Sequence, residues 1–194
     1  MFDTTGLQPL TLPPLIVATG RVVVVDATAF DTDPREAFPQ PVPEGRWPVE
    51  AFVRRVPVVD GEQPQIALVR VRFAEDAVAS WTPAGTVAVD TGVAAVMDAL
   101  AYEILLEDRA DHFADPAAEH EEPDIHRELL FAMDGPGPVC RAGAIPILVE
   151  DDPPTNIVGF HSGPGDGVYA CHWGIAAEGH VAQLVIDFGG LARS

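Results

Sequence analysis

Four aspartates at the ends of apolar segments are the residues of this sequence best suited to chemistry: Asp26, Asp90, Asp166 and Asp187. Carboxylate oxygens are the preferred ligands of hard divalent cations. If the strand ends bring these side chains to one rim, they could hold a divalent ion for a hydrolytic reaction. The same side chains could instead cap separate turns, because an aspartate oxygen accepts hydrogen bonds from nearby backbone N–H groups. Both interpretations stay open from the sequence.

The segment from Gly163 to Gly167, with the sequence GPGDG, is the most distinctive short motif. Glycines permit positive φ and the close approach of another group, and Asp166 could bind a cation or cap backbone N–H groups. A calcium loop needs more oxygen ligands at close spacing, and a phosphate cradle is disfavoured because Asp166 would repel the anion. We expect a structural turn with Asp166 bonded to the backbone. The candidate binding residues around it are His161, Gly165, Asp166, Gly167, Tyr169 and Trp173.

Three other patterns match known chemistry less well. Asp90-Thr91-Gly92 has the triplet of aspartic proteases, but that chemistry needs a second triplet, which the sequence lacks. Ser162 lacks the G-x-S-x-G spacing of a nucleophile elbow. The two cysteines, Cys140 and Cys171, fit no common zinc spacing with the histidines. We therefore predict two reduced, metal-free thiols and no bound cofactor, with a divalent cation only in the metal-site alternative.

The charge of the chain limits its partners. Thirty acidic residues face eleven basic ones, which gives a formal net charge of −19. Such a field repels phosphate backbones and anionic membrane surfaces, so we expect neither nucleic acid nor membrane as a partner. It favours fast association with a basic protein. Every basic residue is an arginine, and the absence of lysine excludes Schiff-base chemistry and the lysine of a P-loop.

The elements that must position these residues are mostly strands. Alternation and turn residues predict strands over 15–26 with a break at Gly20, a hairpin of 49–59 with 65–73, a short strand at 86–90, and four strands over 144–149, 156–161, 168–173 and 181–188. Apolar spacing predicts a long helix from Val93 to Leu106, and a short one follows over 124–133. We predict an α+β, mostly β fold with about nine strands in antiparallel sheets, the long helix lying across one face.

The length of 194 residues favours a single domain, 1–194. Acidic residues crowd the stretch after Glu103, and we expect residues 109–124 to form a solvated, mobile excursion. The first residues lack a basic start followed by an apolar stretch, so we expect a cytoplasmic protein.

The segment FHSGPGDGVYACHWGIAAEGHVAQLVIDF (160–188) resembles a bacterial family of domains of unknown function, number 4241. Its members carry a similar S-G-x-G-D-G-x-Y, then W-G, and a final strand ending in D-F. VVVVDA with Asp26, PEGRWPV at 43–49 and VAVDTGVAAVMD at 87–98 extend the resemblance over nearly the whole chain. Ala170, Cys171 and His172 depart from the family pattern, which weakens a catalytic role for Cys171 or His172.

A looser likeness, in the Gly-Asp-Gly turn before paired strands, is to the SUKH immunity superfamily of bacterial toxin systems, whose members are often acidic because they neutralise basic toxins. Charge and likeness together favour a non-enzymatic acidic binding protein, immunity-like, that engages a basic protein partner. The alternative is a metal-dependent, hydrolase-like enzyme with its carboxylate site at the strand ends, Asp26, Asp90, Asp166 and Asp187.

Overall fold

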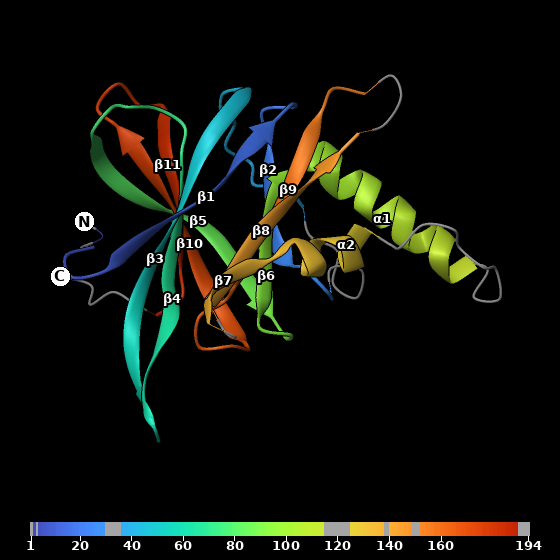
Figure 1. The fold of residues 1–194 in the computed structure, drawn as a ribbon. Coiled ribbons are helices and arrows are strands. Elements are labelled where there is room, and N and C mark those ends of the chain that lie inside the picture. The colour runs from blue at the N-terminus through green and yellow to red at the C-terminus, as the bar shows by residue number, and fades with distance from the viewer. Residues whose placement is uncertain are drawn as a thin grey trace.

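Two antiparallel sheets pack face to face, and two helices lie on the outer side of the smaller sheet (Figure 1). The structure is a computed structural model that describes residue 2 and residues 4–29, 36–114, 125–137, 140–148 and 152–189. Strands dominate because the chain is rich in short apolar runs separated by glycine and proline. The predicted mostly β architecture with antiparallel sheets is confirmed.

The larger sheet has six strands. Their order is β1 (Gln8–Val17), β3 (Gly45–Val58), β4 (Gly61–Arg72), β11 (Val181–Asp187), β10 (Gly167–Ala176) and β5 (Val78–Val89). The predicted hairpins β3–β4 and β10–β11 are both present. Gly179 adopts the positive φ of 90° that the second of these turns requires. β5 is much longer than the predicted strand at 86–90.

The smaller sheet has five strands. Their order is β2 (Val22–Asp26), β6 (Val93–Asp98), β9 (Thr155–His161), β8 (Cys140–Ile147) and β7 (Asp134–Gly137). Helices α1 (Ala99–Ala114) and α2 (Ile125–Ala132) pack on its outer face. β6 and β7 bring the described strands from the predicted nine to eleven. The predicted break at Gly20 lies between β1 and β2, which belong to different sheets.

The predicted helix from Val93 to Leu106 is wrong in its first part, because residues 93–98 form β6 and the helix begins at Ala99. β6 lies in the middle of its sheet, between β2 and β9. A strand buried on both faces is apolar without interruption, so helical spacing fits its sequence equally well. Its side chains alternate between two cores: Ala94 and Val96 face the larger sheet, and Val93, Ala95 and Met97 face the helices.

Three apolar clusters hold the layers together. The main core lies between the sheets and contains the fully buried side chains of Phe73, Phe160, Trp173 and Phe188. A second core lies between the smaller sheet and the helices. The third is small and lies on the outer face of the larger sheet, where the N-terminal segment covers Phe52, Leu68 and Val185.

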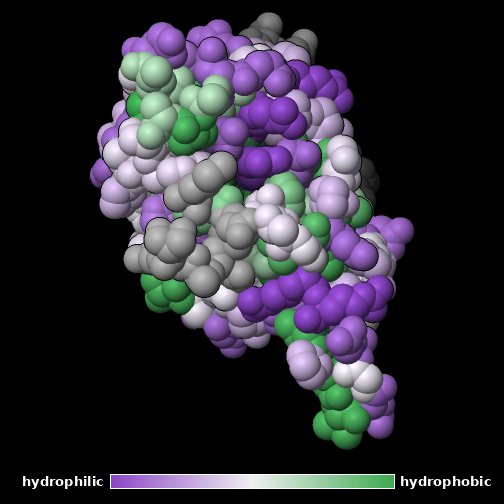
Figure 2. Space-filling view, turned by 90° about the vertical axis from the view of Figure 1, so that its left-hand side faces the viewer, coloured by the Kyte–Doolittle hydropathy of each residue, from purple (hydrophilic) through white to green (hydrophobic). Residues whose placement is uncertain are grey.

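The hairpin of β3 and β4 extends beyond the strands beside it. β1 pairs with β3 no further than Val53, and β11 pairs with β4 only from Leu68 onward. Residues 54–65 therefore form a two-stranded arm to which no other described strand is hydrogen-bonded, and at its base the Ala67 carbonyl accepts the N–H of Phe188. The arm projects from a largely hydrophilic face and has an apolar tip, where Val59 is 101% exposed (Figure 2).

The acidic excursion predicted for residues 109–124 begins inside a helix, because residues 109–114 belong to α1. Residues 115–124 lie outside the described residues. In the part of the chain that the structure describes, no helix is long and apolar enough to cross a membrane.

Candidate functional site

Two chain segments that cross between the sheets lie side by side and form what we call the crossing site. Residues 90–92 lead from β5 in the larger sheet to β6 in the smaller one, and residues 162–166 lead from β9 back to β10. The N–H of Ser162 donates to the carbonyl of Gly92 at 2.9 Å. A Cβ atom built on Gly92 would lie 3.7 Å from the Cα of Gly165. The crossing site therefore contains the aspartic-protease-like triplet and the GPGDG motif together.

Asp26 organises the first crossing segment. Its Oδ2 accepts the N–H groups of Asp90 and Thr91, at 2.7 and 3.1 Å, and its carboxylate also accepts the Thr91 hydroxyl. Its Oδ1 accepts the N–H and hydroxyl of Thr28 and the N–H of Ala29. Burial alone raises the pKa of this carboxyl, but the hydrogen bonds outweigh that effect and hold the pKa below its ordinary value. Asp26 is thus a charged cap for two turns.

The second crossing segment is held by hydroxyl groups. Ser162 Oγ and the Tyr169 hydroxyl both donate to the carbonyl of Gly165, at 2.6 and 2.7 Å. Gly163 has a φ of 68°, and a Cβ atom there would overlap the Ile66 carbonyl oxygen, so only glycine fits. The expected bond from the Asp166 carboxylate to the backbone is not formed within the described residues, and that side chain is exposed.

A small pocket of about 220 Å³ opens beside the crossing site, lined by Gln63, Gln65, Thr91, Gly92, His161, Gly163, Pro164 and Gly165. His161 Nδ1 accepts the N–H of Arg141 at 3.0 Å, so the proton of the neutral ring is on Nε2. Burial, and then the charge of Arg141, lower the pKa of His161. Gln65 Oε1 accepts the Arg54 guanidinium. The lining described for this pocket contains no carboxylate and no guanidinium.

The four aspartates of the predicted carboxylate site lie in different surroundings. Strand pairing places Asp26, Asp90 and Asp166 at one end of the sandwich, since Val89 pairs with Gly167 and Asp26 pairs with Ala94. Asp187 pairs with Ala170, three residues further along β10. Asp26, however, is occupied by its hydrogen bonds. Asp187 lies on the outer face of the larger sheet and accepts the N–H of Gly189 at 2.9 Å. Among the described residues, no three His, Cys, Asp or Glu side chains are grouped closely enough to hold a metal ion.

Five of the six predicted binding residues belong to the crossing site or border it: His161, Gly165, Asp166, Gly167 and Tyr169. The sixth, Trp173, is fully buried between the sheets. Its indole N–H donates to Gln40 Oε1 at 2.9 Å, and its ring packs edge-on against Phe38. Trp173 is thus a core residue and has no surface to offer a partner.

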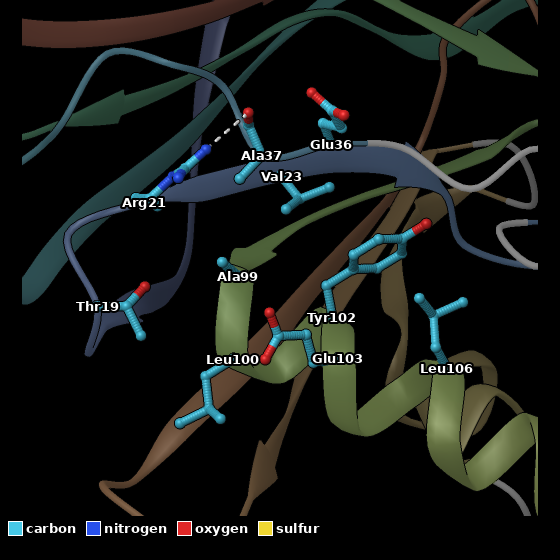
Figure 3. Close-up of a pocket in the computed structure, with 10 residues that line it drawn as sticks. All are labelled: Thr19, Arg21, Val23, Glu36, Ala37, Ala99, Leu100, Tyr102, Glu103 and Leu106. Carbon is cyan, nitrogen blue, oxygen red and sulfur yellow. Dashed lines mark hydrogen bonds between the residues drawn. The ribbon is translucent and has the colours of Figure 1, made fainter.

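Sequence reasoning missed a larger concavity, of about 600 Å³, between β2, the start of α1 and the segment at residues 36–37. We call it the α1 groove; its walls are shown in Figure 3. The ring of Tyr102 forms part of an apolar wall with Val23 and Leu106. Glu103 on α1 and Glu36 on the facing segment extend from opposite walls.

Asp98 holds two of the segments that line this groove, the turn at Thr19 and the first turn of α1. Its carboxylate is fully buried and accepts the N–H groups of Ala18 and Thr19, at 3.0 and 2.9 Å, which fixes the turn between β1 and β2. It also accepts the N–H of Leu100 at 2.9 Å, which caps α1. The sequence signal for this role is an aspartate directly before ALAYE. A helix predicted from Val93 places Asp98 in its interior, where an aspartate is not expected to act as a cap.

Comparison with known proteins gives a family without a stated activity. The profile of the family described as "Protein of unknown function (DUF4241)" matches residues 15–88 and 85–186, which include both crossing segments. No curated protein and no solved structure matches the sequence.

Proposed function

Since the chain belongs to the DUF4241 family, whose description names no activity, we propose a function from its surface: a non-enzymatic acidic binding protein, immunity-like, that engages a basic protein. A bacterial, cytoplasmic setting is part of this proposal. The proposal rests on one observation, which is how the charges are distributed between internal contacts and the exposed surface.

Several of the arginines are used inside the molecule. Arg70 and Arg72 both pair with Glu50, at 2.7 and 3.4 Å. Arg54 donates to Gln65 and to the carbonyl of Gly189, and Arg141 donates to the carbonyl of Met133. These cations are used on carbonyl and amide oxygens and on Glu50, and Arg72 also lies 3.4 Å from the exposed Glu75.

Many acidic side chains, in contrast, extend into solvent without a counterion. Within the described residues, the exposed side chains that form no ion pair include Glu36, Glu44, Asp60, Glu62, Asp90, Glu103, Glu107, Asp152, Asp166 and Glu178. They lie in β4, in α1 and in the segments that connect the strands. A negative field speeds the encounter with a positively charged partner and opposes self-association.

The test is to immobilise the protein, capture partners from cells that carry its gene, and measure the association rate of each purified partner. We expect a basic partner whose association rate falls about tenfold when the salt rises from about 50 to about 300 mM, because salt screens exposed charges. An adjacent gene that encodes a basic toxin would supply the first candidate. A tight partner that is acidic, or one whose association rate does not change with salt, would overturn the proposal.

The metal-dependent alternative is tested in thermal melts with calcium, magnesium, manganese or zinc. The variants are Asp166→Asn and Asp187→Asn, measured beside the wild type. We expect no ion to shift the melting temperature in a saturable way, because Asp26 and Asp187 already accept hydrogen bonds from the chain. A saturable shift that either variant abolishes would favour the enzyme instead.

A further inference from the structure

The α1 groove is where the acidic surface and a concave apolar surface coincide. We propose that this groove receives an arginine side chain of the basic partner, with its methylene groups against the apolar wall and its guanidinium at Glu103. This inference rests on the proposed function and names the contact that function would use.

The charges that line the groove favour a cation. Glu36 and Glu103 extend from its two walls. The buried Asp98 is outside the lining and accepts the N–H of Thr19 at 2.9 Å. Arg21 is the one cation among the lining residues, and its Nη2 is turned to the carbonyl of Ala37 at 3.4 Å. Two lining carboxylates against one guanidinium leave the groove with a net negative charge. The Asp98 charge also offsets the partial positive charge of the α1 N-terminus.

The apolar wall suits the remainder of an arginine side chain. Ala99 and Leu106 are half-buried and present aliphatic carbon along the groove, whereas Val23 and Tyr102 line it while only 1% and 4% exposed. Arginine buries its methylene stem against such surfaces and keeps its charged head at a polar rim. A guanidinium also donates two parallel hydrogen bonds to a carboxylate, which an ammonium group does not do. Size adds support, because about 600 Å³ is within the range of specific ligand sites.

The probe is the peptide acetyl-Gly-Ser-Arg-Ser-Gly-amide, compared with the same peptide carrying citrulline, which has the shape of arginine without its charge. Binding is followed by NMR through the backbone amides of Ala99 and Tyr102. We expect Glu103→Gln to weaken binding of the arginine peptide about tenfold, as for the loss of one charge-assisted hydrogen bond. The matched control is Glu107→Gln, one turn along α1 and outside the groove lining, with less than about a twofold effect.

A charge-neutral variant separates shape from charge. Ala99→Met should narrow the groove and weaken binding about threefold or more without altering the net charge, in a protein whose melting temperature is unchanged. Equal weakening by Glu103→Gln and Glu107→Gln, with no effect of Ala99→Met, would overturn the groove while leaving the acidic binding function standing. Equal binding of the citrulline peptide would also overturn it. The proposed function itself is refuted separately, by capture of a tight partner that is acidic or whose association rate does not change with salt.

Discussion

Replacing Asp26 with asparagine tests how much one carboxylate contributes to joining the two sheets. In the native protein, Asp26 Oδ2 accepts the N–H groups of Asp90 and Thr91, while Oδ1 accepts those of Thr28 and Ala29. Asparagine keeps one acceptor oxygen and presents its own N–H₂ group to the other pair. Two charge-assisted bonds are then lost, at about 1.5 kcal/mol each, so the free energy of unfolding should fall by about 3 kcal/mol.

Urea denaturation followed by tryptophan fluorescence at neutral pH measures this loss. The melting temperature should fall by about 6–12 °C, at about 2–4 °C per kcal/mol for a chain of this size. Asp166→Asn is the matched control, because the same chemical change at an exposed carboxylate should alter the free energy of unfolding by less than about 0.5 kcal/mol. Equal destabilisation by the two variants would refute the assignment of Asp26 as the cap of the crossing site.

The pH dependence gives a second measure of the same interaction. Because the folded pKa of Asp26 lies below its unfolded value, its contribution to stability is present above the unfolded pKa of about 3.9 and is lost as the pH falls through the folded pKa. The difference in unfolding free energy between wild type and Asp26→Asn should therefore shrink as the pH drops below about 4. A difference that stays constant down to about pH 2.5 would contradict a charged Asp26 in the folded protein.

Two further predictions concern the backbone of the crossing site and the buried thiols. Gly163→Ala should lower the free energy of unfolding by about 2–4 kcal/mol, because the new Cβ overlaps the Ile66 carbonyl. The control Gly179→Ala also has a positive φ but open space around the new Cβ, and it should lower the free energy of unfolding by about 1 kcal/mol. Both values are measured by urea denaturation, and similar losses for the two variants would count against a steric overlap at Gly163. Burial raises the pKa of Cys171 to about 12 and also raises that of Cys140. Both thiols should resist a thiol reagent at mildly alkaline pH and react as two free groups after unfolding, without release of zinc; rapid reaction of the native protein would contradict their burial.

The strands and their hairpins were predictable because each carries its own local signal. Turn glycines and period-two alternation located β3, β4, β10 and β11 correctly. The same local rules failed at Val93–Asp98, where burial on both faces removes the alternation that marks a strand. Whether such a run pairs with β2 and β9 depends on contacts with residues far away in the chain, which periodicity does not report.

The site shows the same division between local and distant information. The GPGDG motif was correctly identified as a turn, yet the carboxylate that stabilises the crossing site is Asp26 and not Asp166. Asp26 lies more than sixty residues from Thr91, to which it is bonded. The α1 groove combines residues from β2, the segment at 36–37 and α1. No spacing rule joins segments that only the folded sheets bring together.

The two-stranded arm has a consequence for how the protein behaves at high concentration. The two strands of the arm pair with each other, but their outer edges carry backbone groups that no further described strand covers, and the tip carries valines. Strands from other molecules can pair with such open edges, which leads to aggregation. In the register of the arm, Pro57 lies opposite Glu62 and Pro64 lies opposite Arg55. A proline fits an antiparallel pair only where its nitrogen points away from the partner strand, toward the outer edge. Because proline has no N–H group, each outer edge of the arm lacks a hydrogen-bond donor at one position. The arm thus exposes Val59 at its tip, while each of its edges lacks one of the donors with which a strand from another molecule would pair.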